Sequence, residues 1–400
     1  MSLLVRDARV VAGDGTPALP RANVRIEGDR IAAVGPGIAP APGDTIIEAH
    51  GRVLMPGFVD AHTHALWAGD RLDEWEQRLR GASYLEILAA GGGILSTVRA
   101  VRAASEDQLA HDLRRRLDHM LREGTTTVEV KSGYGLSTEH ELKMLRAIET
   151  AARGFAGTVV STALLGHARD ADAGGGAAFV DRTLEETLPA VHVAFPGITI
   201  DAFCEEAAWS LADCRRLLEG ARSLGHPLRL HADQFHRLGG LDLAIELCAR
   251  SVDHLEASSP ADLARLAAAG VTGVMLPATG FHTDGRYADA RALLDAGGSL
   301  VLASNCNPGS SPTSSIPLVI ALARRQLHVT IDEAIAAVTS RAAALLGFRD
   351  RGRIAPGLRA DAILLRHTDE RQLGHELGGN PVDVAIAAGR VSAQGAVCTQ

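Results

Sequence analysis

Two histidines stand two residues apart in the segment MPGFVDAHTH (55–64), directly after a short apolar run. On a β-strand, residues i and i+2 point to the same face, so the imidazoles of His62 and His64 can converge on one ion. Neutral imidazole is a common ligand of zinc and iron. The pair alone is weak evidence, because two ordinary, partly exposed histidines at a strand end are the commoner explanation of such a stretch. Further ligands from other strand ends must decide between these interpretations.

The middle of the chain alternates between short apolar segments and amphipathic helices. Asp107–Arg122 is the clearest helix, because leucines recur there at every fourth position and Gly124 follows. Eight strand–helix units over roughly 300 residues predict a (β/α)8 TIM barrel, and eight near-continuous apolar strands favour it over a doubly wound sheet. The predicted strands are Gly57–Asp60, Thr125–Val130, Thr158–Leu165, Ile198–Phe203, Pro227–Leu230, Ser251–His254, Gly273–Leu276 and Ser299–Ala303.

Both ends of the chain differ from this middle part. Residues 1–54 contain five short β segments separated by glycine and proline, and short β segments return after residue 352, at Arg353–Ile354, Ala362–Arg366, Val384–Ala387 and 389–391. We therefore predict two domains. A small composite β-sandwich is formed by 1–54 together with 353–400, and the barrel occupies 55–352.

Composition restricts the class of protein. The net charge is −8 and the basic residues are interspersed with acidic ones, which argues against a nucleic-acid partner. No apolar run approaches the ~20 residues that a membrane span needs, and the N-terminus does not resemble a signal peptide. Five widely spaced cysteines without a CxxC pair do not suggest a disulfide framework. The expectation is a soluble, cytoplasmic protein.

Histidines close four of the eight predicted strands: His62 with His64, His167, His231 and His254. In a TIM barrel, the groups that do chemistry sit at the C-terminal ends of the strands. Four strands that end this way favour a metal centre over chance packing. A metal held by imidazoles would lower the pKa of a bound water toward ~7 and polarise a substrate carbonyl or imine.

Several longer strings resemble the amidohydrolase superfamily and, more closely, the imidazolonepropionases within it. They are PGFVDAHTH (56–64), SYLEILAAGGGILSTVRAVRAAS (83–105), GTTTVEVKSGYGL (124–136), LLGHA (164–168), LHADQ (230–234), DHLE (253–256), MLPAT (275–279) and NPGSSP (307–312). They follow the order of that family, and the strings GGGILSTVRA and EVKSGYG are much more specific than the histidine pair.

The resemblance implies metal-dependent hydrolysis of the ring amide of 4-imidazolone-5-propionate to N-formimino-L-glutamate, in histidine degradation. One divalent ion, zinc or iron, would be held by His62, His64 and His231 together with residue 305, and His254 would lie beside the reacting carbonyl. Arg71 would anchor the substrate carboxylate, since a guanidinium suits a bidentate partner. The further substrate-binding residues that the match implies are Tyr84, Tyr134, His167, Gln234, Asn307, Gly309 and Ser310. Homodimers are common among such relatives, so a second copy is an expected partner.

Asn305 departs from the family, which ordinarily has an aspartate there that binds the metal and helps to take a proton from water. An amide carries no charge and is a poor base. Three alternatives follow. In the first, His254 acts as the base alone, with Asn305 as a weak oxygen ligand. In the second, Cys306 or a neighbouring carboxylate replaces the missing base. In the third, the chain is an impaired enzyme, or a protein that binds the ligand without turning it over. A related cyclic amidohydrolase or deaminase that acts on another heterocycle is the alternative activity. Lys131 is expected to brace the site electrostatically and not to bind the metal.

Overall fold

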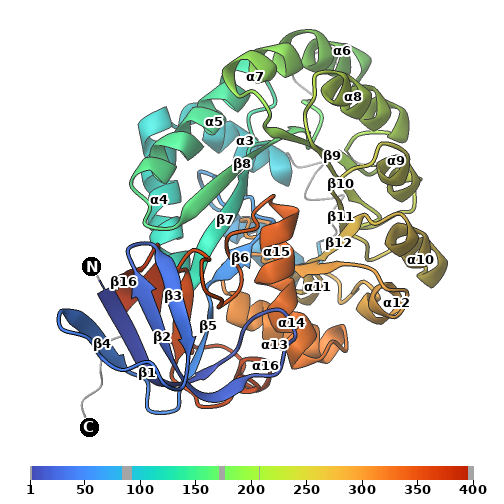
Figure 1. Ribbon diagram of the computed structural model, residues 1–400. Helices are drawn as coiled ribbons and strands as arrows, with labels where there is room; N and C mark the ends of the chain where they lie inside the picture. Colours follow the sequence, from blue (N-terminus) through green and yellow to red (C-terminus); the bar gives the residue numbers. More distant parts are fainter. Residues whose placement is uncertain (1, 83–91, 171–175, 207, 395–400) are drawn as a thin grey trace.

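The middle of the chain forms a ring of parallel strands with helices around it (Figure 1). The computed structural model describes residues 2–82, 92–170, 176–206 and 208–394. Each strand of the ring pairs in parallel with the next one along the chain. The strands are β6 (Phe58–Asp60), β7 (Thr125–Lys131), β8 (Thr158–Gly166), β9 (Thr199–Cys204), β10 (Leu228–Ala232), β11 (Ser251–His254), β12 (Thr272–Met275) and β13 (Leu300–Leu302). The predicted TIM barrel is confirmed.

The first and last strands of the ring are joined just beyond their C-terminal ends. The backbone N–H of Asn305 donates to the carbonyl of His62 at 3.0 Å, and that of His64 donates to the carbonyl of Cys306 at 3.0 Å. These bonds bring the two predicted metal-binding segments together. The seam of the barrel therefore lies at the site itself.

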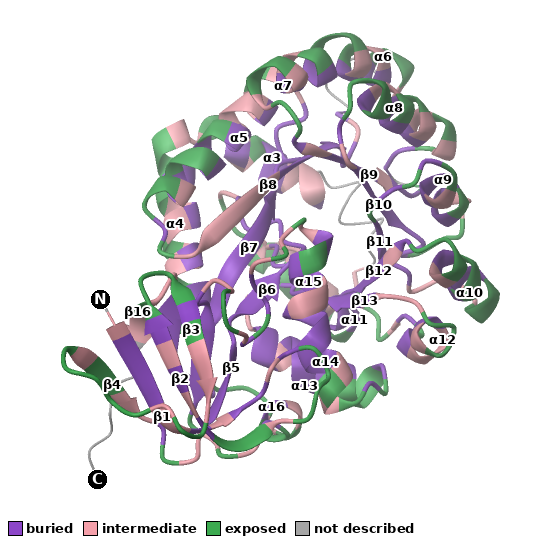
Figure 2. Ribbon diagram, viewed as in Figure 1, coloured by how far each residue is buried: buried purple, intermediate pink, exposed green. Residues whose placement is uncertain are grey.

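The helices cover the strands with their apolar faces. They are α1 (Leu72–Leu79), α3 (Ile94–Ala103), α4 (Glu106–Arg122), α5 (Thr138–Arg153), α6 (Gly176–Arg182), the π-helix η2 (Thr183–Thr187), α7 (Leu188–Ala194), α8 (Leu211–Ser223), α9 (Gly240–Glu246), α10 (Pro260–Ala268), α11 (Pro277–His282), α12 (Ala290–Asp295), α13 (Ile316–Gln326), α14 (Ile331–Ala337), α15 (Ser340–Leu345) and α16 (Gln372–His375). In α4 the periodic leucines are buried, and the Ser105 hydroxyl caps the helix by accepting from the N–H of Gln108. Figure 2 shows the same division on other helices, with buried residues toward the strands and exposed ones outside. Among the described helices, none is long and apolar enough to cross a membrane.

Both chain ends contribute to one small mixed sheet. Its strands are β1 (Ser2–Val10), β2 (Leu19–Glu27), β3 (Arg30–Gly35), β4 (Asp44–Glu48), β5 (Val53–Pro56), β14 (Ala362–Leu365), β15 (Val382–Ala387) and β16 (Arg390–Gln394). Their order is β16-β15-β14-β5-β1-β2-β3, with β4 beside β1, and the antiparallel pair β5–β14 joins the two ends of the chain. A buried apolar cluster extends from Leu3 and Ile26 to Leu364 and Ile386. The expectation of a barrel plus a small domain from both ends is confirmed.

The exact domain boundaries, 1–54 with 353–400 and 55–352, remain our proposal. β5 crosses the first boundary, because it pairs with the small sheet and leads directly into β6. The segment Arg353–Ile354 is irregular, so its prediction as a strand was wrong. Its backbone instead forms a hydrogen bond with the N-terminal segment, since the N–H of Ile354 donates to the carbonyl of Ala12 at 3.0 Å.

Phe58 begins the first barrel strand and is fully buried. We expect Phe58→Ala to lower the free energy of unfolding by about 3–5 kcal/mol, because it removes a large buried side chain and leaves a cavity. Phe281→Ala is the matched control, since that ring is 65% exposed and should change stability little. Urea denaturation followed by circular dichroism measures both. Equal losses in the two variants would contradict this placement of the core.

Candidate active site

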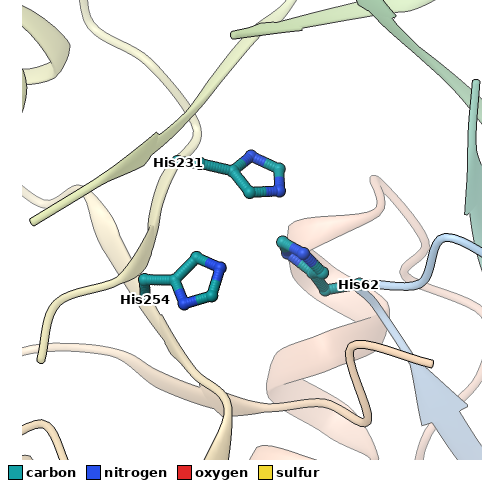
Figure 3. A group of neighbouring side chains, drawn as sticks. All are labelled: His62, His231 and His254. Carbon is teal, nitrogen blue, oxygen red and sulfur yellow. The ribbon is translucent and has the colours of Figure 1, made fainter. Parts of the chain in front are cut away.

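Three histidines from three strand ends point toward one another inside the barrel (Figure 3). The ring centroids of His62 and His231 are 4.5 Å apart, those of His231 and His254 are 5.6 Å apart, and those of His62 and His254 are 6.0 Å apart. All three side chains are buried, and one nitrogen from each lies within 4.8 Å of the others. This spacing lets the three rings face a common ion.

His64 joins this group. Its Nε2 lies 3.4 Å from Nε2 of His231. Two imidazole nitrogens that bind one tetrahedral ion at ~2.0–2.1 Å are about 3.3–3.4 Å apart, so the pair has the spacing of metal ligands. Three buried atoms nearby have no hydrogen-bond partner among the described residues: Nε2 of His62, Nδ1 of His64 and Oδ1 of Asn305. Buried acceptors without a partner are costly, and a cation would satisfy Nε2 of His62 and Oδ1 of Asn305.

Two carboxylates fix which nitrogen each histidine presents. Nδ1 of His62 donates to Oδ2 of Asp253 at 2.6 Å, and Nδ1 of His231 donates to Oδ1 of Asp201 at 3.1 Å. The proton therefore sits on Nδ1, and Nε2 keeps its lone pair for the centre of the group. Burial, with the charge of Lys131 adding to it, lowers the pKa of His62 well below its usual range. Burial also lowers the pKa of His231, so both rings are neutral at pH 7.

A fully buried layer of charged side chains lies behind these carboxylates. Nζ of Lys131 donates to Oε1 of Glu129 at 2.7 Å and to Oδ2 of Asp201 at 2.8 Å. Arg229 donates to Oδ2 of Asp253 at 2.6 Å. Burial would raise the pKa of Asp201, but the charge of Lys131 and the hydrogen bond from His231 hold it well below its usual range. The layer holds the carboxylates in place and keeps Asp201 ionised.

Asn305 has a buried amide oxygen, and its backbone adjoins that of His62. Its Nδ2 donates to Oγ1 of Thr279 at 2.8 Å, which leaves Oδ1 as the atom without a partner. Its backbone has a φ of 55°, a left-handed conformation that asparagine tolerates better than most residues do. The amide oxygen is thus available as a neutral ligand, and a metal there would settle its orientation.

The loop after β7 brings Tyr134 against His167. The Glu141 carboxylate accepts hydrogen bonds from the backbone N–H groups of residues 133, 135 and 136, at 2.8–2.9 Å, and so fixes this loop. Nδ1 of His167 donates to the carbonyl of residue 133 at 2.9 Å, and its ring stacks on His64 with centroids 5.0 Å apart. The Tyr134 ring lies 5.1 Å from that of His167. Burial lowers the pKa of His167 to about 3 and raises that of Tyr134, so both are uncharged at pH 7.

Arg71 lies beside the loop that follows β13. A Cβ added to Gly309 would lie 3.0 Å from Nη1 of Arg71, so the glycine permits this close approach. Arg71 forms an ion pair with Glu74, while its Nε is buried and has no partner among the described residues. A cavity of about 380 Å³ is lined by both Arg71 and Gly309. A guanidinium with a free donor beside a cavity can receive an anionic group.

The remaining predicted substrate-binding residues, where the structure describes them, form no hydrogen bond with the histidine group. Oδ1 of Asn307 accepts from the N–H of Gly309 at 2.9 Å and from that of Ser310 at 2.7 Å, so this side chain shapes its own loop. Gln234 is buried two residues beyond the end of β10. Tyr84 lies outside the described residues.

Sequence reasoning missed the residues that support the histidines, in particular Asp201, Arg229 and Asp253. The sequence does contain a signal for such a charged layer, namely charged residues inside the barrel strands. Arg229 stands two residues before His231, and Glu129 stands two residues before Lys131. Residues i and i+2 share a face of a strand, and a charge on the inner face of a barrel must have a partner.

Comparison with known proteins identifies the family of this chain. A family model described as "Amidohydrolase family" matches residues 78–391. An imidazolonepropionase of Herpetosiphon aurantiacus is 44% identical, over 97% of this chain and 96% of that protein. An imidazolonepropionase of Rubrobacter xylanophilus is also 44% identical, over 92% of this chain and 90% of that protein.

The chain belongs to the imidazolonepropionase family of amidohydrolases. The similarity to this family extends over the small domain as well as the barrel, since nearly the whole chain is covered. Among solved structures, a triazine hydrolase variant superposes with a TM-score of 0.75 at 18% identity, covering 100% of this chain and 96% of that one. At that identity the likeness shows the fold alone.

We expect His231→Ala to weaken metal binding by at least about 100-fold, because residues that merely orient metal ligands already contribute 10- to 100-fold. His236→Ala is the control, since His236 is half-exposed and bonds Glu205 instead. Elemental analysis after dialysis against a chelator measures the metal retained. Equal retention by the two variants would remove His231 from the ligand set.

Proposed function

We propose that this chain hydrolyses the ring amide of 4-imidazolone-5-propionate to N-formimino-L-glutamate, in the degradation of histidine. The convergence of four buried histidines carries the proposal, in a chain 44% identical to proteins named imidazolonepropionase. This would make the chain a hydrolase that cleaves the C–N bond of a cyclic amide.

In the proposed centre, Nε2 of His62, His64 and His231 would hold one divalent ion, with Oδ1 of Asn305 as a further oxygen ligand. Nitrogen donors with one oxygen suit zinc or iron. A metal bound there supplies a water whose pKa is lowered toward ~7 and an electrophile for the ring carbonyl. The unpartnered atoms at His62 and Asn305 support this ligand set.

His254 is the proposed base. Its Nδ1 lies 3.2 Å from Oε1 of Glu256, which leaves Nε2 as the nitrogen that exchanges a proton. His254 would take a proton from the attacking water as the new C–O bond forms, and deliver it to the ring nitrogen as the C–N bond breaks. Because the Asn305 amide is a poor base, this assignment follows the alternative in which His254 acts alone.

The substrate is a small anionic molecule, and its propionate would bind Arg71. Nε of Arg71 has no partner among the described residues, while Glu74 holds the other side of the guanidinium. Tyr134 and His167, as uncharged side chains beside His64, would contact the ring. Tyr84, Gln234, Asn307, Gly309 and Ser310 complete the proposed substrate-binding set. A homodimer and a cytoplasmic location belong to the same proposal, and light scattering would test the first.

The direct test is turnover of 4-imidazolone-5-propionate by the unaltered chain and by Asn305→Asp, assayed side by side. We expect the unaltered chain to hydrolyse it, since His254 retains a base, and to lose activity when a chelator removes the metal. Loss of the substrate's ultraviolet absorbance follows the reaction. Turnover by Asn305→Asp alone would identify the unaltered chain as a binding protein. Full activity in metal-free protein would refute the metal-dependent mechanism.

Arg71→Ala should raise KM for imidazolone propionate by about 10- to 150-fold, which corresponds to the 1.5–3 kcal/mol of a hydrogen bond to a charged group. Arg78→Ala is the matched control, because Arg78 lines the same cavity from the last turn of α1. Steady-state kinetics on both variants measures KM and kcat for imidazolone propionate. Unchanged constants in Arg71→Ala would favour a heterocycle without an anionic tail.

A further inference from the structure

The chain contains two lysines, Lys131 and Lys143, among 40 basic residues; the others are arginines. A guanidinium is a planar fork, whereas an ammonium is a compact charge with three donors. Lys143 uses this shape to donate to three backbone carbonyls, at 2.8–3.0 Å. Lys131 also stands among three acceptors, but these are carboxylates.

The ammonium of Lys131 occupies a cage built from three strands. Its Nζ lies 2.7 Å from Oε1 of Glu129 on β7, 2.8 Å from Oδ2 of Asp201 on β9 and 3.9 Å from Oδ2 of Asp253 on β11. All four side chains are fully buried. Asp201 and Asp253, with His231, also have the spacing of a group that could hold a metal ion. The lysine nitrogen hydrogen-bonds one of the carboxylates that such an ion would use, Asp201, and forms a longer ion pair with the other, Asp253.

Charge balance favours a cation in the cage. The three carboxylates and the two cations, Lys131 and Arg229, leave one net negative charge in the buried layer. Without the lysine the excess would be two negative charges, which one divalent ion would neutralise. Uncompensated charge in a protein interior is strongly unfavourable, so without the ammonium a metal ion or protons would have to take its place.

We propose that Lys131 fills a second cation position in the barrel and thereby restricts the centre to one metal ion. The inference rests on the proposed function, in which the histidines hold that ion. Because the ammonium neutralises Asp201 and Asp253, these carboxylates remain hydrogen-bond acceptors for His231 and His62. Lys131 is a positioning residue that determines metal stoichiometry.

The test is the number of metal ions per chain in full-length protein that has been saturated with Zn²⁺ and desalted. Lys131→Met keeps most of the volume and removes the charge, and Lys143→Met removes the only other lysine. We expect one ion in the unaltered chain, two in Lys131→Met and one in Lys143→Met, by elemental analysis. Circular dichroism on the same samples confirms that the variants are folded.

Two ions in the unaltered chain, or one ion in folded Lys131→Met, would overturn the inference. If Lys131→Met folds only when Zn²⁺ is added, the number of ions per folded chain decides, since two ions support the inference and one contradicts it. If it does not fold at all, titration of the unaltered chain with Co²⁺ decides, because binding of a second equivalent contradicts the inference and saturation at one supports it. An unaltered chain with neither metal nor turnover would refute the proposed function as well, whereas one ion with turnover in both chains refutes only the role of Lys131.

Discussion

The hydrogen bonds from His62 to Asp253 and from His231 to Asp201 are the interactions on which the rest of the site depends. Each one sets the tautomer of a histidine and directs its Nε2 into the barrel. The two carboxylates are fully buried, and Lys131 and Arg229 lie against them. A site that faces substrate is therefore held by a layer of charges that substrate never contacts.

The fold makes this layer possible. Parallel strands bring residues from distant parts of the chain to the same height in the barrel, so Arg229 on β10 can reach Asp253 on β11 and the carbonyl of Ala61 beyond β6, at 2.6 and 2.8 Å. The last of these bonds ties the fifth barrel strand to the segment that carries His62. The closure bonds between residues 62–64 and 305–306 complete the ring at the same level. The hydrogen bonds that close the barrel are therefore made by the same segments that carry the site residues.

The sequence predicted the strands and the histidines well, because both leave a local signal. Apolar runs of strand length are visible in the sequence, and all eight barrel strands lie where such runs were found. The charged layer leaves a weaker signal, since Asp201 or Arg229 could equally have been a surface residue at the end of a strand. Which charge meets which depends on the register between neighbouring strands. The register between β9, β10 and β11 is a property of the closed barrel and cannot be inferred from any one segment.

Asn305 is best understood together with the charged layer. The ligand atoms of the proposed centre, three imidazole nitrogens and an amide oxygen, are all neutral. The negative charge instead lies one hydrogen bond away, on Asp253 and Asp201, where it makes the imidazoles better donors without occupying a coordination position. A centre with neutral ligands keeps more positive charge at the substrate carbonyl than a centre with a bound carboxylate would. In the proposed mechanism, Asn305 would leave the ion more electrophilic but without a carboxylate base beside it, and proton transfer would be the task of His254.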